Sequence, residues 1–307
     1  MPRPSSSWRS SPARPAPDAG PHGYGRRAAE YDDRTPGAER SMAFPRLHRL
    51  ALLFLMAVIA GCASIPDTGH GRFVARTVEL DGMRMPYQVF VPAAAARGPG
   101  ALPVVLFLHG SGERGNDGIR QTEAGLGPYL RAHAADFPAL AVLPQVADGE
   151  EWSGRNNRLA IAALDAAIRE FGADPKRQYL TGMSMGGYGS WNIALAEPAR
   201  FAAVVPVCGA VRAPRNERPG LLVEAVAQEA DPYMAIARRL ENVPLWIFHG
   251  ARDDVVRPDD DRRLHAAFQA VGARDARYTE YPHGNHNAWD ATYADPAMWR
   301  WLFAQKR

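Results

Sequence analysis

Residues 178–196, QYLTGMSMGGYGSWNIALA, pass from a short apolar run through a glycine-rich turn into a segment compatible with a helix. The turn contains the pattern Gly-x-Ser-x-Gly, with Ser184 at its centre. A serine at a sharp strand-to-helix turn has a strained backbone and an exposed hydroxyl, and flanking glycines avoid clashes with neighbouring elements. The N-terminus of the following helix directs free N–H groups and a positive dipole end at that hydroxyl. This stretch therefore predicts a nucleophilic serine at position 184.

A serine hydroxyl is a poor nucleophile unless a base removes its proton. Residues 281–286, YPHGNH, follow an apolar stretch and offer two histidines. We favour His286 as the general base, because it lies in a glycine-containing loop ahead of a late helical segment and is followed by Trp289 and Asp290. His283 is the alternative.

The acid that orients the imidazole is expected after a strand and before the histidine in the chain. The apolar run LWIFHG ends at Gly250, and Asp253 and Asp254 follow it. A carboxylate at this place would fix the imidazole tautomer and stabilise the imidazolium. We favour Asp253, with Asp254 as the alternative. The resulting chain order of serine, aspartate and histidine is that of the α/β-hydrolase fold.

Backbone N–H groups are needed where negative charge develops on a tetrahedral intermediate. Met185, directly after the serine, is expected to supply one. The glycine-rich loop at residues 109–115, HGSGERG, is expected to supply the other through Ser111, with the residue directly before or after it as the alternative. His109 is expected to bond within this loop, and Glu113 and Arg114 are expected to form a local ion pair or to contact substrate. The loop lacks the Gly-Lys-Ser/Thr of a phosphate-binding loop.

The rest of the chain alternates between strand-like and helix-like segments. RFVARTVEL and RMPYQVFVP predict two early strands joined by the Asp81-Gly82 turn. Later apolar runs such as VVLFLHG, LAVLPQ and AAVVPV suit parallel strands covered on both faces. We predict an α/β-hydrolase domain over residues 71–307, with a mainly parallel central sheet, helices on both faces and a small lid or none. Residues 209–241 depart from this alternation of strands and helices, and they form either one side of the substrate site, as a wall or a small lid, or an ordinary surface insertion.

The N-terminal part has the features of a targeting segment. Residues 1–41 are rich in Pro, Ser, Gly, Arg and Ala, which indicates a disordered leader or a mis-assigned start. From Met42 a basic segment is followed by an apolar run that is too short for a membrane span and predicts a signal peptide over residues 42–61. The run closes as Ile59-Ala60-Gly61-Cys62, which looks like a bacterial lipobox, with a plain signal peptide as the alternative. Cys62 is then the lipidated residue, and residues 62–70 are a linker. We expect a lipid-anchored protein of the bacterial cell envelope, on the outer membrane and facing the periplasm.

Composition excludes several other classes. The formal net charge is +3, and the basic residues are interspersed with acidic ones, whereas nucleic-acid binding needs a clustered basic face. The chain has only two cysteines and no Cys-x-x-Cys spacing for a metal or redox centre. Cys208, within the apolar AAVVPVCGA, is expected to be a small core residue.

Four motifs carry a resemblance to a known group. LFLHGSGERGND, YLTGMSMGGYGSW, FHGARDDVV and HGNHNAWDATY are similar to bacterial α/β-hydrolases called predicted peptidases or phospholipase/carboxylesterase-like proteins. These are related to feruloyl and acetylxylan esterases and, more distantly, to the catalytic domain of prolyl oligopeptidase. Relatives commonly have proline where this chain has Arg257.

The resemblance implies a serine esterase that uses Ser184, Asp253 and His286, with oxyanion donors near Ser111 and Met185. Such an enzyme needs no metal and no organic cofactor, and its substrate would be a small-molecule or polysaccharide-linked ester. A serine peptidase with the same triad is the first alternative. A non-catalytic binding lipoprotein is the second, and the presence of all three triad residues argues against it.

Overall fold

The computed structural model describes residues 69–97, 101–214 and 218–307. Contacts divide the chain at residue 60, and the description concerns only the unit Gly61–Arg307. The predicted leader, the signal peptide, Cys62 and most of the linker lie outside the described residues. Within the described ranges no helix is both long and apolar enough to cross a membrane.

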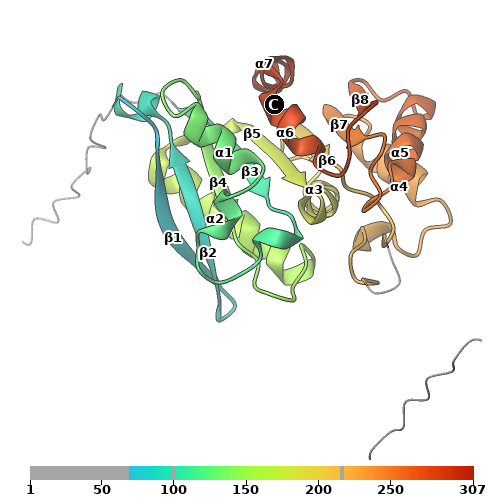
Figure 1. Cartoon of the computed structure of the whole chain (residues 1–307), viewed down its shortest axis with the longest axis horizontal. Coiled ribbons are helices and arrows are strands. Elements are labelled where there is room, and N and C mark those ends of the chain that lie inside the picture. Colours follow the sequence, from blue (N-terminus) through green and yellow to red (C-terminus); the bar gives the residue numbers. More distant parts are fainter. Residues whose placement is uncertain (1–68, 98–100, 215–217) are drawn as a thin grey trace, which may run out of the picture. The chain divides into compact units, whose positions relative to one another are not determined.

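A single sheet of eight strands forms the centre of this unit, in the order β1-β2-β4-β3-β5-β6-β7-β8 (Figure 1). β1 and β2 pair antiparallel across the turn at Asp81 and Gly82, which both have positive φ as a tight hairpin requires. β2 also pairs antiparallel with β4, and every later pairing is parallel. The strands are β1 (Arg72–Leu80), β2 (Met83–Val91), β3 (Leu102–Leu108), β4 (Leu140–Pro144), β5 (Ala173–Met183), β6 (Ala203–Val207), β7 (Leu245–Gly250) and β8 (Ala276–Tyr281).

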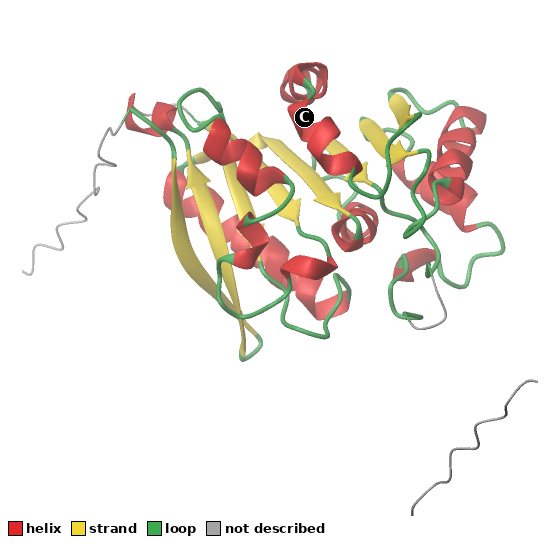
Figure 2. Cartoon of the chain, in the orientation of Figure 1, coloured by secondary structure: helices red, strands yellow, loops and turns green. Residues whose placement is uncertain are grey.

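Helices cover both faces of the sheet, as the uninterrupted apolar strands predict (Figure 2). In β3 the side chains of Val104, Leu106 and Leu108 belong to one core, and those of Val105 and Phe107 belong to the other. The first core is shared with α2 (Gly154–Phe171), α3 (Met185–Ala196), α4 (Pro232–Leu240) and α5 (Asp259–Ala270). The second is shared with α1 (Leu126–Ala132), α6 (Ala288–Ala294) and α7 (Pro296–Ala304).

The segment 209–241 contains an element that the sequence reading missed. Pro232 is the first residue of α4. Asp231 caps that helix by accepting hydrogen bonds from the N–H groups of Tyr233 and Met234. Proline is compatible with the first helical position, because that residue has no intrahelical N–H partner to lose. The alternation of strands and helices therefore continues through α4 to β7.

Candidate active site

Ser184 stands alone between β5 and α3, with φ of 52° and ψ of −117°. This left-handed backbone is fixed by its surroundings, since the Ser184 N–H donates to the carbonyl of Val207 and the Ser184 carbonyl accepts from Gly187. A Cβ at Gly186 would lie 1.9 Å from the Leu108 carbonyl oxygen, and a Cβ at Gly187 would lie 2.7 Å from the Cα of Gly209. The glycines of the motif are therefore required by close backbone approach to β3 and to the segment after β6.

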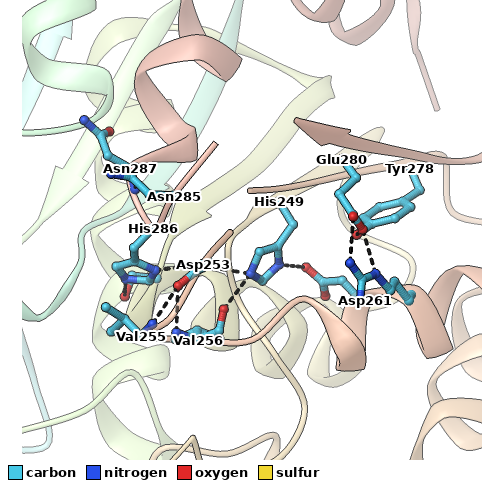
Figure 3. A network of polar contacts seen from close by, with 12 residues as sticks. His249, Asp253, Val255, Val256, Asp261, Tyr278, Glu280, Asn285, His286 and Asn287 are labelled. Atoms are coloured by element: carbon cyan, nitrogen blue, oxygen red, sulfur yellow. Dashed lines mark hydrogen bonds and ion pairs between the residues drawn. The ribbon is translucent and has the colours of Figure 1, made fainter. Parts of the chain in front are cut away.

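The three predicted residues come together from separate loops. His286 Nε2 lies 2.9 Å from Ser184 Oγ. On the other side of the ring, His286 Nδ1 lies 2.6 Å from Asp253 Oδ2 (Figure 3). The Asp253 carboxylate can only accept, so Nδ1 holds the proton and Nε2 is left to accept from the serine hydroxyl. The chain thus places an imidazole of one defined tautomer between a hydroxyl and a carboxylate.

Asp253 is a fully buried carboxylate with a complete set of donors. Its side chain is 0% exposed, and its Oδ1 accepts hydrogen bonds of 2.9 Å from the N–H groups of Val255 and Val256. Burial alone would raise the pKa of Asp253, but hydrogen bonds from His249, His286 and Val256 outweigh burial and hold the pKa well below its usual range. The carboxylate is therefore charged in the folded chain at neutral pH.

The two alternatives from the sequence, Asp254 and His283, do not take part in the hydrogen bonds between Ser184, His286 and Asp253. Asp254 is exposed and has no hydrogen bond to His286 among the described residues. The imidazole of His283 is also exposed, and its Nδ1 lies 3.0 Å from Arg252 at the surface. The geometry favours Asp253 and His286.

His249 is a residue of the site that sequence reasoning missed. It lies in β7, and its ring contacts Asp253 on one side and Asp261 of α5 on the other (Figure 3). His249 Nδ1 is 2.7 Å from Asp261 Oδ2, and His249 Nε2 is 2.8 Å from the Val256 carbonyl and 3.2 Å from Asp253 Oδ2. The available signal was a lone histidine in the otherwise apolar run LWIFHG, four positions before the aspartate.

The loop after β3 lies against Ser184, where an oxyanion hole is required. A Cβ at Gly110 would be 3.6 Å from Ser184 Cβ. Ser111 begins a short 3₁₀ helix and Met185 begins α3, and N–H groups at such first positions have no partner within the helix. His109 is structural, as expected, because its Nε2 accepts from the Val146 N–H and its Nδ1 lies 2.6 Å from the Gly110 carbonyl.

The expected ion pair between Glu113 and Arg114 is wrong. Arg114 instead pairs with Glu151 at 2.8 Å, and Arg218 pairs with the same carboxylate at 2.7 Å. Arg218 Nη1 also donates to Ser111 Oγ at 2.8 Å. Arg218 belongs to the segment 209–241, so part of that segment forms a wall beside the Ser111 loop.

Three tryptophans and one cysteine near the site have distinct surroundings. Trp152 is buried and donates to the His109 carbonyl, and Trp191 is buried against Phe268. Trp289 is partly exposed and meets the His286 ring edge to face, at 5.5 Å between centroids. Cys208 is free and fully buried, as predicted, and burial raises the pKa of its thiol.

The sheet order and the position of Ser184 between a strand and a helix define an α/β-hydrolase fold. Within this class the chain belongs to the prolyl oligopeptidase family, whose sequence model matches residues 150–303. Both findings agree with the resemblance drawn from the motifs.

Solved structures and sequence relatives of this chain include esterases. A thermostable esterase is 28% identical with a TM-score of 0.62, and the match covers 76% of this chain and 63% of the other. A ferulic acid esterase is 17% identical with a TM-score of 0.60, over 76% of this chain and 96% of the other. A protein of Nocardia uniformis subsp. tsuyamanensis, named "Putative esterase NocK", is 31% identical over 52% of this chain and 48% of its own length. The chain therefore spans about half of that relative.

Proposed function

We propose that this chain is a serine hydrolase that cleaves carboxylic esters through an acyl-enzyme. The observation that carries the proposal is the hydrogen-bonded series Ser184–His286–Asp253, at 2.9 Å and 2.6 Å. A nucleophile, a base and a group that orients the base within such distances are the requirements for activating a hydroxyl. The likeness to a thermostable esterase at 28% identity supports the ester as substrate.

Each residue of this series has a role in the proposed reaction. His286 Nε2 takes the Ser184 proton as Oγ attacks the ester carbonyl carbon, and Asp253 stabilises the imidazolium that forms. The N–H groups of Met185 and Ser111 donate to the oxyanion. Collapse breaks the ester C–O bond, and the alcohol leaves with the proton held by His286. Water then attacks the acyl-enzyme in the same way, which releases the carboxylic acid and restores the serine.

A fluorophosphonate probe tests whether Ser184 is an activated nucleophile. We expect stoichiometric labelling of the folded protein, loss of labelling in Ser184→Ala, and a fall in p-nitrophenyl acetate turnover on the order of 10⁶-fold in that variant. Ser190 is the control, because it lies in the same helix but its hydroxyl donates to the Gly186 carbonyl. Ser190→Ala should keep its label, and a folded wild-type protein that takes no label would overturn the proposal.

A serine peptidase is the second candidate, and the match to the prolyl oligopeptidase family over residues 150–303 favours it. The same residues would serve an amide, with His286 delivering its proton to a leaving amine. Parallel assays with p-nitrophenyl acetate and proline p-nitroanilide decide between the two. We expect kcat/KM to be larger for the ester, and efficient release of p-nitroaniline with negligible ester turnover would make the peptidase the better description.

We also propose that the enzyme is anchored to the bacterial outer membrane through a lipid on Cys62, facing the periplasm and acting on small-molecule or polysaccharide-linked esters. The support is the sequence Ile59-Ala60-Gly61-Cys62 after an apolar run. Labelled palmitate should be incorporated into the protein in bacterial cells and lost in Cys62→Ser. Incorporation that persists in this variant would contradict the anchor.

A further inference from the structure

Three ionisable side chains lie in a row behind His286, away from water. The side chains of Asp253, His249 and Asp261 are each 0% exposed. They come from the loop after β7, from β7 itself and from α5 (Figure 3). Since an unpaired buried charge is very costly, the protonation state of this row must satisfy all three groups together.

The partners of the His249 ring fix where its protons are. Nε2 faces the Val256 carbonyl at 2.8 Å and Asp253 Oδ2 at 3.2 Å, and both of these are acceptors, so Nε2 carries a proton. Nδ1 faces Asp261 Oδ2 at 2.7 Å, a distance typical of a charge-assisted hydrogen bond. A second proton therefore lies between Nδ1 and Asp261.

Burial raises the pKa of Asp261 and so favours a proton on that carboxyl, but the two carboxylates that flank His249 favour keeping the second proton on the imidazole. Burial alone would lower the pKa of His249, but hydrogen bonds to Asp253 and Asp261 outweigh burial and raise the pKa to about 10. Asp260 of α5 adds negative charge nearby, whereas the charge of Glu280 in β8 is paired with Arg262 at 2.7 Å. The other ionisable groups that face the row are neutral acids or the base of the site: Tyr188, Cys208, Tyr278 and His286.

We propose that His249 is a positioning residue of the active site, a buried imidazolium paired with Asp261 that holds Asp253 charged and oriented toward His286. The hydrogen-bonded series then runs Ser184–His286–Asp253–His249–Asp261. The proposal rests on the proposed function of Ser184 and His286 as nucleophile and base.

A charge count gives this arrangement its purpose. With His249 positive and both aspartates negative, the buried row has one net negative charge, which matches the single positive charge that His286 acquires in the transition state. With a neutral His249, either Asp261 would have to take up the proton or two unbalanced carboxylates would share one core. The pair His249–Asp261 therefore lets the fold bury a charged Asp253 at the correct place.

The protonation of His249 can be measured without any turnover. In the full chain labelled with ¹⁵N-histidine, we expect one buried histidine with two protonated ring nitrogens at neutral pH, whose signals disappear in His249→Gln. If that variant does not fold, Asp261→Asn assigns the signals by shifting them. A neutral His249, with one protonated nitrogen at pH 7, would overturn the proposal even if Ser184 is labelled by a fluorophosphonate.

Kinetics test the effect on His286. Gln at position 249 can keep a donor near Asp253 and Val256 but carries no charge, so kcat should fall roughly 10- to 100-fold, the equivalent of one charge-assisted hydrogen bond, with KM little changed. The acid limb of the kcat/KM profile should move to higher pH, because removing the nearer positive charge favours protonation of His286. This direction holds whether or not Asp261 takes up a proton.

Matched controls separate this role from packing. Asp261→Asn should lower kcat as His249→Gln does. Asp259→Asn, in the first turn of the same helix but with an exposed side chain, should leave kcat and the profile unchanged. A fall in kcat for His249→Gln without movement of the acid limb indicates packing alone and would refute the proposal. Absence of Ser184 labelling in the wild type, with a charged His249, would instead refute only the proposed function.

Discussion

At the scale of single residues, Asp253 differs from its neighbour Asp254 in every contact. Asp253 accepts from two backbone N–H groups through Oδ1 and from His286 and His249 at Oδ2, whereas Asp254 projects into solvent. Because both side chains are carboxylates, the difference in their contacts comes from their positions in the loop and not from their chemistry. Asp253 is buried and bonded to His286, whereas Asp254, one residue later, is a charge at the surface.

Replacing these two aspartates in turn tests that assignment. Asp253→Asn keeps the volume but offers His286 Nδ1 a group that can donate, so the wrong imidazole tautomer is favoured and kcat should fall on the order of 10⁴-fold. Asp254→Asn should change kcat less than about twofold, because surface substitutions have small effects. Esterase assays of both purified variants provide the measurement. Equal losses in the two would show that Asp253 has no special role.

The sequence predicted Ser184, Asp253 and His286 because each stands in a local pattern: a glycine motif, a strand end or a glycine-containing loop. His249 could not be found in that way, since its role depends on Asp261, which lies twelve positions further along in another element. The partner of Arg114 was missed for the same reason, because Glu151 comes from a distant loop. Contacts across elements are set by the fold, and local spacing does not encode them.

At the scale of elements, the strands were the easiest to predict and α4 the hardest. Buried parallel strands are short apolar runs with distinct boundaries, and β1 matches its predicted residues Arg72–Leu80. α4 begins with Asp231-Pro232, which is both a helix-capping pair and a common turn signal. Only its packing against α3 and α5, which the sequence alone does not show, decides between the two.

The junction of β5 and α3 depends on Gly186, and this can be tested by adding one methyl group. In Gly186→Ala the new Cβ would lie 1.9 Å from the Leu108 carbonyl oxygen, which is backbone and cannot rotate away. We expect the free energy of unfolding to fall by about 1–3 kcal/mol or more, and esterase activity to fall with it because β3 leads into the Ser111 loop.

Gly220→Ala is the matched control, because a Cβ there meets nothing within 4 Å and its φ is not positive. Urea denaturation should show a change in the free energy of unfolding within about 0.5 kcal/mol for this variant. If Gly186→Ala were as stable and as active as Gly220→Ala, the close packing of the elbow against β3 would not be a requirement of the fold.

At the scale of the whole unit, the buried row of Asp253, His249 and Asp261 lies among the side chains of the core that β7 shares with α5. Leu245, Ile247, Leu264 and Phe268 of these elements are all buried apolar residues. Burying charges there costs free energy that only mutual pairing offsets. The free energy of unfolding of this unit is therefore expected to depend on the protonation of His249.

The sign of that dependence follows from the pKa of His249, which is about 10 in the folded chain and about 6.5 for an ordinary histidine in the unfolded chain. A raised folded pKa means that the folded state binds the proton more tightly. The stabilisation is then complete below about pH 6.5 and is lost progressively as the pH rises toward 10. The low pKa of Asp253 acts in the opposite sense, but only under acidic conditions, as its carboxylate becomes protonated.

Urea denaturation at several pH values between 6.5 and 9.5 tests this dependence through the difference in unfolding free energy between the wild type and the double variant His249→Gln/Asp261→Asn, in which no unpaired carboxyl is left at position 261 to take up a proton. The difference should be largest near the acidic end of this range and should shrink steadily as the pH rises, while the buried tyrosines and Cys208 contribute equally to both proteins and cancel. For Ser190→Ala, which changes no ionisable group, the corresponding difference should stay constant. A wild-type advantage over this double variant that does not change with pH would mean that His249 is neutral in the folded chain and that Asp253 is kept charged by its backbone donors and His286 alone.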